Sequence, residues 1–294
     1  MSFDRFAAID WSGAKGERQK GIAVGFCERG NGPPALLHRG KDWSRPAVLE
    51  WLREIAAAPQ RTLIGLDLGI SLPFADCGAF FPGLAQSPQS AQELWALVEQ
   101  TSSEEPHLGA NSFVDHPQFA PYFRRHGGRE GDAFRCDEAE HGRGRFRITE
   151  REQERQGCKP YSNFNLVGAA QVGKSSLTGM RVLHRLKDDM AIWPIDPLPD
   201  GGSVVVEIYT TIAALAAGRS AARAKMRTHE DVDVALRELG SRPIGRTGRI
   251  DDHSADALVT AAWLRRASDR PELWAPTGMT ADVARTEGWT FGVA

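Results

Sequence analysis

The sequence has little that points to a membrane protein, a disulfide scaffold or a zinc centre. No run of about 18 apolar residues occurs in its 294 residues, so we expect no membrane-spanning helix. The cysteines, at positions 27, 77, 136 and 158, are far apart and include no Cys-x-x-Cys pair, which favours reduced thiols. The first ten residues lack the basic and then apolar pattern of a signal peptide, so we expect a cytoplasmic protein with no membrane partner.

The chain also lacks an excess of charge of one sign. It has 36 Lys and Arg residues against 38 Asp and Glu residues, a formal net charge of -2. Such a balance creates no overall field toward nucleic acid, so any nucleic-acid site must be a local patch. Hydrophobic residues at 41% and charged residues at 25% are ordinary for a globular protein, and the length allows one domain with a large insertion.

Short apolar runs between glycines and prolines predict the strands of an α/β fold. A helical stripe over 48–56, ended by Pro59, predicts an amphipathic helix, and the apolar run at 62–67 predicts a strand buried on both faces. The other expected strands are 6–10, 21–27, 35–38 and 203–209, and the later expected helices are 212–217, 228–239 and 254–267.

The stretch 80–202 differs in composition from the rest, because most of it is polar and rich in glycine. It therefore predicts a long central insertion between two core parts, 1–79 and 203–294. Ser90 with Glu93 predicts a capped helix to about residue 100. Beyond it, arginines alternate with Phe119, Tyr122, Phe123, Phe134 and Phe146. Basic and aromatic side chains suit phosphate contact and base stacking, but the interspersed acids fit a solvated surface equally well.

Three of the apolar segments each carry one acid: Asp10, Asp67 and Glu207. The last helical segment opens with two further acids, Asp252 and Asp256, which are four residues apart and share a helix face. A buried carboxylate needs a cationic partner, a proton or a metal ion. One such Asp usually marks a turn or a helix cap, whereas the joint pattern favours a metal site.

These segments together resemble the RNase H-like superfamily. AAIDWSG at 7–13 and LIGLDLGISLP at 63–73 resemble its first-strand and fourth-strand motifs, and HSADAL at 253–258 is similar to the His-x-x-Asp-Ala helix of RuvC-type Holliday-junction resolvases. With VVVEIYTT around Glu207 and GAAQVGKSSLTG in the insertion, the chain most closely resembles an uncharacterised family of predicted nucleases. The resemblance implies a mixed sheet flanked by helices, in which the first and fourth strands are neighbours and bring Asp10 close to Asp67.

The resemblance further implies a nuclease that hydrolyses the phosphodiester bonds of DNA or RNA with two metal ions. Carboxylate ligands without a cysteine or histidine cluster suit Mg²⁺ or Mn²⁺. Asp10 would bridge both ions, Asp67 and Asp256 would each hold one, and Asp252 would be an alternate or water-mediated ligand.

Three further residues have less certain roles in this scheme. Glu207 is either a further catalytic ligand or the partner of a basic side chain from the insertion. Asp251 is expected to cap the last helix. His253 either assists the movement of water or product, or is a partly exposed histidine without a role.

Three other interpretations compete with the nuclease. Residues 168–175 match the phosphate-loop expression, but the polar residues 159–165 before them do not suit the strand that such a loop follows, so Lys174 is expected to contact a substrate phosphate or simply the solvent. Asp10-Trp11-Ser12-Gly13 resembles the first phosphate motif of actin-like ATPases and sugar kinases, which need two such units. A scaffold that binds nucleic acid or protein without cutting is the other alternative, in which the acids point apart or pair with arginines.

Overall fold

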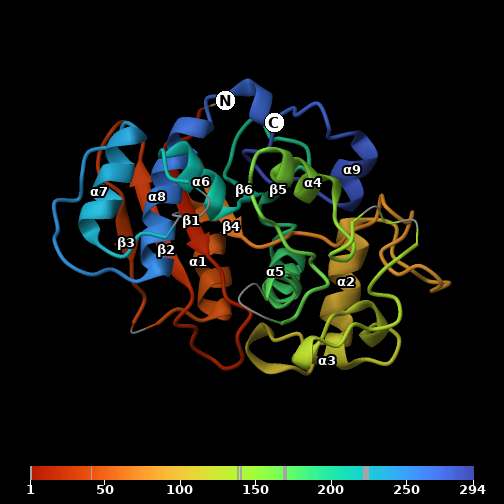
Figure 1. The fold of residues 1–294 in the computed structure, drawn as a ribbon. Helices are drawn as coiled ribbons and strands as arrows, with labels where there is room; N and C mark the ends of the chain where they lie inside the picture. The colour runs from red at the N-terminus through yellow and green to blue at the C-terminus, as the bar shows by residue number, and fades with distance from the viewer. Residues whose placement is uncertain (1, 41, 138, 140, 168–170, 221–224) are drawn as a thin grey trace.

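A six-stranded mixed sheet forms the centre of the molecule (Figure 1). The computed structural model describes residues 2–40, 42–137, 139, 141–167, 171–220 and 225–294. In these ranges the strand order is β3-β2-β1-β4-β6-β5. The strands are β1 (Arg5–Asp10), β2 (Ala23–Glu28), β3 (Ala35–Leu37), β4 (Thr62–Asp67), β5 (Ala191–Trp193) and β6 (Val204–Glu207). β2 is antiparallel to β1 and β3, whereas β1, β4, β6 and β5 run parallel, so the expectation of a mixed α/β sheet is confirmed.

The helices begin where the sequence supplies capping side chains. Ser90 Oγ accepts a hydrogen bond from the Glu93 N–H at 3.2 Å, and Thr228 Oγ1 accepts one from Asp231 at 3.2 Å, as predicted. The helices are α1 (Arg45–Ala57), α2 (Ala91–Thr101), α3 (Asn111–Asp115), α4 (Ile148–Arg155), α5 (Val172–Leu186), α6 (Thr210–Ala216), α7 (His229–Glu238), α8 (Asp252–Ala267) and α9 (Ala281–Thr286).

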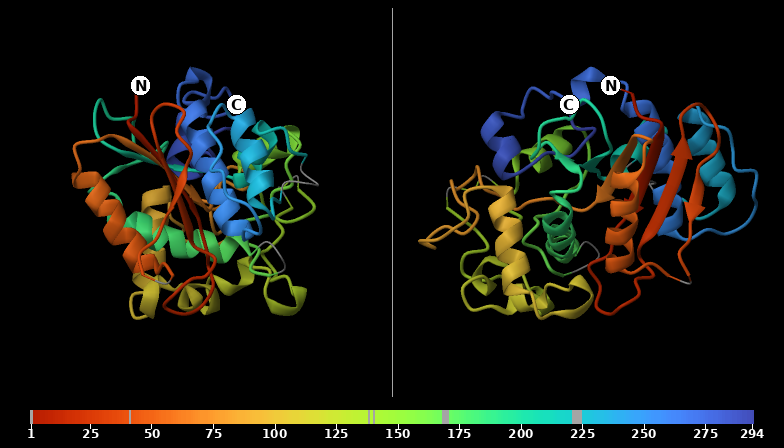
Figure 2. Two further views of the ribbon diagram at one scale, coloured as in Figure 1. Left: turned by 90° about the vertical axis from the view of Figure 1, so that its left-hand side faces the viewer. Right: turned by 180° about the vertical axis from the view of Figure 1, so that it is seen from behind.

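Helices cover both faces of the sheet (Figure 2). Along β1, Phe6 and Ala8 join one hydrophobic core, while Ala7 and Ile9 join the other, because successive strand residues point to opposite faces. The first of these cores contains residues of α6, α7 and α8, and the second contains residues of α1, α2 and α5. The position of each residue in β1, including Asp10, therefore determines which face of the sheet its side chain points to.

Glycines in the two strands that flank β1 let α8 lie close to the sheet. A Cβ atom at Gly25 of β2 would sit 2.2 Å from the carbonyl oxygen of Ala257, and one at Gly65 of β4 would sit 2.6 Å from a methyl group of Ile208 and 3.0 Å from Leu264. Contact at 2.2 Å with backbone cannot be relieved by turning a side chain. The missing side chains therefore fix how near the first turns of α8 come to β1.

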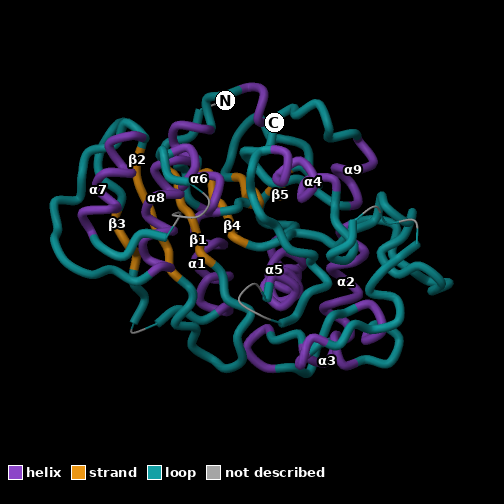
Figure 3. The backbone as a smooth tube through the Cα atoms, in the orientation of Figure 1, coloured by secondary structure: helices purple, strands orange, loops and turns teal. Residues whose placement is uncertain are grey.

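The segment 80–202 belongs to the same sheet and core. Its strand β5 pairs with β6, so residue 202 is not where the sheet resumes. Its helix α5 packs against α1 and α2, while the region around α3 is mostly loop (Figure 3). The sequence missed β5 because it has only three residues and ends directly before Pro194.

The aromatic residues of this segment are interior residues. Phe119, Tyr122, Phe123, Phe134 and Phe146 are all buried, so they cannot stack against a nucleic-acid base. Several of the interspersed arginines have carboxylate partners: Arg125 pairs with Asp115, Arg135 with Glu130, Arg143 with Glu154 and Arg145 with Asp76. The alternation of basic and aromatic residues thus builds a local core and its ion pairs.

The expectation of four reduced thiols is wrong for two of the cysteines. Cys77 and Cys136, which are 59 positions apart, form a disulfide. Cys27 and Cys158 are free and buried, as expected. Sequence spacing could not predict the pair, because the fold brings together two segments that are distant in the chain.

Among the helices that the structure describes, none is both long enough and apolar enough to cross a membrane.

Candidate carboxylate site

Asp10 and Asp67 lie side by side at the carboxyl ends of two central strands. β1 and β4 are parallel neighbours, and their register pairs Asp10 with Asp67 directly. Asp10 points to the face that Phe6 and Ala8 share, because these residues are two apart. Asp67 is likewise two residues from Gly65, which packs against Leu264 of α8. Both carboxylates are therefore on the face that α8 covers.

The first turn of α8 brings further polar groups to this face. The side chain of Asp251 accepts a hydrogen bond from the Ser254 N–H at 2.9 Å, so the predicted helix cap is confirmed. Nδ1 of His253 lies 3.3 Å from Oδ2 of Asp10. Asp252 pairs with Lys225, whose Nζ is 2.6 Å from Oδ2, at a partly exposed position. The charge of Asp252 is thus compensated by a lysine.

Burial and mutual repulsion mark Asp10, Asp67 and Asp256 as one electrostatic group. Burial, followed by repulsion from Asp10 and Asp256, raises the pKa of Asp67 well above its ordinary value. Burial, followed by repulsion from Asp10 and Asp252, raises the pKa of Asp256 to about 7. Burial also raises the pKa of Asp10, although its hydrogen bond with His253 acts in the opposite direction. Three carboxylates from β1, β4 and α8 therefore repel one another at one place.

Asp67 has weak compensation for its position. Within the described ranges it forms no ion pair, and its hydrogen-bond partners are the N–H and Oγ1 of Thr210, at 3.4 and 3.5 Å. These distances are longer than those of good hydrogen bonds. A cation between the carboxylates would relieve both the repulsion and the poor hydrogen bonding.

A cavity of about 540 Å³ opens beside Asp67. Its lining includes Asp67 and His253 from the site and Tyr161, Asn163 and Ser175 from the segment 80–202. This volume is within the range of small-ligand sites. Asp67, together with His253, the partner of Asp10, therefore borders a space that can admit a ligand.

Glu207 belongs to the opposite face of the sheet. The register pairs it with Leu66, one residue before Asp67, and Leu66 is in the core that α1 and α5 cover. A shift of one residue along a strand reverses the face of the side chain. Glu207 therefore lies near Asp67 in the sheet but points away from it.

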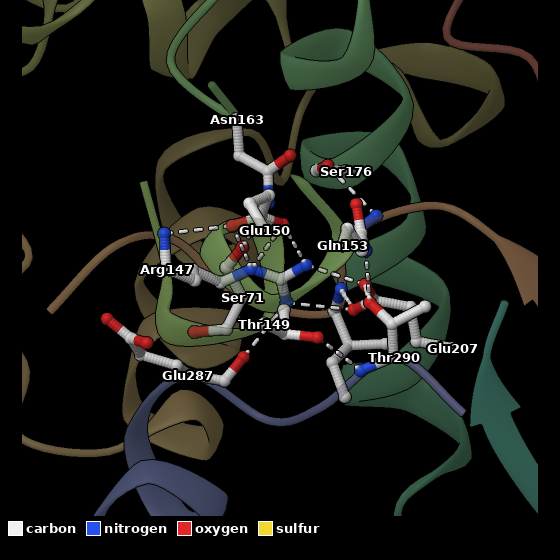
Figure 4. Close-up of polar contacts among 12 residues, drawn as sticks. Ser71, Arg147, Thr149, Glu150, Gln153, Asn163, Ser176, Glu207, Glu287 and Thr290 are labelled. Atoms are coloured by element: carbon white, nitrogen blue, oxygen red, sulfur yellow. Dashed lines mark hydrogen bonds and ion pairs between the residues drawn. The ribbon is translucent and has the colours of Figure 1, made fainter. Parts of the chain in front are cut away.

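The carboxylate of Glu207 is held by a buried arginine (Figure 4). Nη1 and Nη2 of Arg147 lie 2.8 and 2.6 Å from its two oxygens, and the Ile70 N–H donates at 2.8 Å. Burial opposes the charge of Arg147, but Glu150 and Glu207 raise its pKa above the ordinary value. Of the two roles that the sequence left open for Glu207, the structure shows the ion pair with a basic residue of the segment 80–202.

Arg147 was missed by sequence reasoning. It is 1% exposed, Nε donates to Glu150 Oε1 at 2.9 Å, and Nη1 also donates to the carbonyl oxygen of Glu287 at 2.9 Å. Both Arg147 and Glu207 also line the cavity. In the sequence nothing separates Arg147 from the neighbouring arginines, because its role depends on contacts with residues 60 and more positions away.

Lys174 lies beside a second, smaller cavity. This space of about 260 Å³ is lined by Lys174, Arg45 and His107, and it shares Gly13 and Ala14 with the larger cavity. A Cβ atom at Gly13 would sit 2.4 Å from the carbonyl carbon of Lys174, so the loop after β1 packs directly on the first turn of α5. The predicted contact of Lys174 with a substrate phosphate stays a prediction.

The match to a phosphate loop is only partial. A helix does begin at Val172, but no strand of the sheet occupies residues 159–167 before it. The residues 168–170 lie outside the described ranges. A phosphate loop needs the preceding strand, so its main structural requirement is not met in the part described.

No group of three or more His, Cys, Asp and Glu side chains in the described part of the chain forms a ready-made metal site. Magnesium commonly takes only one or two carboxylates and completes its shell with water and substrate phosphate. The donor chemistry of Asp10 and Asp67 fits that mode of binding.

Comparisons with protein-family models, with curated proteins and with solved structures find no match to this chain.

Proposed function

We propose that the protein is an RNase H-like, metal-dependent nuclease whose site consists of Asp10, Asp67 and Asp256. The observation that carries the proposal is the direct pairing of Asp10 with Asp67, because both Asp10 and Asp256 repel Asp67, which lies at the edge of a cavity. The central position of β1, with β4 beside it, is the arrangement that the resemblance implied. A scaffold has no use for such a pair, because uncompensated acids lower its stability.

The residues fit Mg²⁺ or Mn²⁺ in number and in chemistry. Asp10 and Asp67 would hold the ions, Asp256 would complete the group from α8, and Asp252 would join only by leaving Lys225. When bound, the ions supply an activated water and stabilise the charge on the leaving 3′ oxygen. The buried position of Asp10, at 6% exposure, limits its motion and so fixes the position of its carboxylate.

His253 is placed to hold a proton beside the reacting groups. Its ring is half exposed, and its Nδ1 is 3.3 Å from Oδ2 of Asp10. The hydrogen bond with Asp10 raises the pKa of His253, against the effect of its partial burial. A histidine with this contact can orient Asp10 when it is charged and release a proton to solvent as the carboxylate takes up a cation.

Nucleic acid is the proposed partner, and a basic loop next to α8 supports it. Residues 240–250 run around the outside of α7 to the start of α8 (Figure 1). Asp233 fixes this loop by accepting hydrogen bonds from the N–H groups of Ile244 and Gly245, at 2.7 and 3.1 Å. Arg246 and Arg249 are exposed on it and form no ion pair with any residue described. An ordered loop with unpaired arginines suits a phosphate backbone.

Cleavage of labelled DNA and RNA in the presence of Mn²⁺ tests the proposal. We expect Asp10→Asn and Asp67→Asn to lower the cleavage rate about a hundredfold or more, because stabilisation of transition-state charge by a metal ion is worth several kcal/mol. Calorimetric titration should show Mn²⁺ binding to the wild type and its loss in Asp10→Asn.

Asp251→Asn is the matched control, since it removes a neighbouring charge while asparagine still caps α8. It should keep both cleavage and Mn²⁺ binding. Absence of cleavage on every substrate, together with absence of Mn²⁺ binding at millimolar concentration, would overturn the nuclease and favour the non-catalytic scaffold.

A further inference from the structure

The cavity beside Asp67 has an exposed aromatic ring on its wall. Tyr161 is 47% exposed and, with Val234, is one of two large hydrophobic side chains exposed in the described ranges. Tyr161 lines the cavity together with the rings of Tyr209 and Trp11. Val234 is on α7, which contributes nothing to that lining. Tyr161 thus combines exposure with a position at the candidate site.

The backbone holds this ring in place from both sides. Pro160 and Ser162, the neighbours of Tyr161 in the chain, are both buried. Asn163 is 3% exposed, and its Nδ2 donates to the carbonyl oxygen of Ser71 at 2.9 Å. A ring on an anchored segment loses little conformational freedom when a ligand stacks on it. The exposure of Tyr161 is therefore not that of a loosely attached surface residue.

Polar groups suited to a base edge accompany the ring. Gln171 is exposed at the N-cap position of α5, makes no capping hydrogen bond with its side chain, and lines the cavity. Ser175, one turn further along α5, lines it as well. An amide and a hydroxyl beside a flat aromatic surface are the groups that proteins use to bind unpaired bases.

We propose that this cavity takes one unpaired nucleotide, with its base stacked on Tyr161 and its phosphate directed toward Asp10 and Asp67. The inference rests on the proposed function and specifies its substrate class, which is a single-stranded nucleic acid or a single-stranded end. In a duplex the faces of the bases are already stacked on their neighbours, so Tyr161 can engage a base only after unpairing. A cavity of about 540 Å³ has the size of a small-ligand site and suits one nucleotide.

Binding of labelled oligonucleotides to the wild type, measured by fluorescence anisotropy with Ca²⁺ in place of Mn²⁺, tests this under conditions chosen to suppress cleavage. A short single strand should bind more tightly than a blunt duplex of the same sequence. Tyr161→Ala should weaken single-strand binding about five- to a hundredfold, the usual range for loss of one stacked base. Tyr161→Phe should bind as the parent does, because phenylalanine keeps the ring, and Val234→Ala is the matched control for loss of an exposed hydrophobic side chain.

The outcomes separate this inference from the proposed function. Equal affinity for single strand and duplex, no effect of Tyr161→Ala, or no binding of either nucleic acid would overturn the inference. Cleavage that needs Asp10 but not Tyr161 would leave the nuclease standing and remove the base pocket. If binding depends on Tyr161 but the protein never cleaves nucleic acid, the base pocket stands and the nuclease is overturned. Competition by a free mononucleotide distinguishes a pocket for the nucleotide alone from one that also needs the strand.

Discussion

Single carboxylates in this protein differ in how their charge is compensated, and the difference follows from the strand face on which each one lies. Glu207 is buried but has Arg147 against both of its oxygens. Asp67, on the next strand and the other face, has two long hydrogen bonds from Thr210. Buried charges persist only when they are compensated, so Glu207 is stable in the protein alone while Asp67 needs a proton or a cation.

The same lack of compensation at Asp256 predicts that the stability of the protein depends on pH. Its pKa is about 7 in the folded protein, against an ordinary value of 3.8. The folded state therefore holds an extra proton between these values. Its stabilising effect is complete below pH 3.8 and is lost as pH rises through about 7. In a chelating buffer, the unfolding temperature of the wild type should fall from ~pH 5 to ~pH 8, and that of Asp256→Asn should fall less.

Asp251 provides the contrasting case. Its hydrogen bonds with Ser254 lower its pKa in spite of partial burial, so its contribution has the opposite pH dependence and is lost at low pH. Asp251→Asn should therefore keep the alkaline loss of stability that Asp256→Asn reduces. Mn²⁺ should restore the unfolding temperature of the wild type at ~pH 8, and identical pH profiles for wild type and Asp256→Asn would contradict the electrostatic group.

At the scale of elements, the site depends on how closely α8 approaches the sheet. Asp10 and Asp67 are fixed by strand register, whereas Asp256 and His253 arrive on a helix that is held by packing. Gly25 permits this packing, since a Cβ atom there would sit 2.2 Å from the carbonyl oxygen of Ala257. The distance between the strand acids and the helix acid is thus set by a residue that carries no charge.

Gly25→Ala should therefore weaken both stability and metal binding. Overpacking against backbone costs about 1–3 kcal/mol, and the shift of α8 would move Asp256 away from Asp10. Chemical denaturation and Mn²⁺ titration measure the two effects. Gly201→Ala is the control, because a Cβ atom there meets nothing within 4 Å. Unchanged Mn²⁺ affinity in Gly25→Ala would show that the position of α8 does not govern the site.

The sequence predicted the elements that carry strong local signals. The apolar run at 62–67 is β4 to the residue, and the caps at Ser90 and Thr228 start α2 and α7. The register pairs Asp10 directly with Asp67, while the role of these acids and of Asp256 as metal ligands stays a prediction. The direction of Glu207 was not predictable, because it depends on the pairing of β6 with β4, two strands far apart in the chain. The burial of Phe119 and Phe134 was not predictable either, because it also depends on tertiary contacts. Their alternation with arginines in the sequence does not show what each ring packs against.

At the scale of the whole molecule, the nearly balanced charge limits how nucleic acid can bind. A net charge of -2 gives no general attraction, so affinity must come from local groups such as Arg246 and Arg249. Their double replacement by serine should weaken binding and reduce the slope of log affinity against log salt by about two.

The matched control for this pair is a double replacement of Arg53 and Arg270 by serine. These arginines are paired with Asp189 and Glu272, and Arg270 follows the far end of α8. The same net charge is removed, so the control should leave the salt slope unchanged. Equal effects of the two double variants on the slope would indicate a general charge effect and contradict a role for the loop.

The pairing of β1 with both β4 and α8 also bears on when the protein becomes active. Asp10 and Asp256 are far apart in the sequence, and α8 packs directly on β1 and β2. A chain still on the ribosome can form the strand acids early but must wait for α8 before the group is complete. If cleavage needs Asp256 as proposed, a nascent chain is therefore inactive until translation has passed α8.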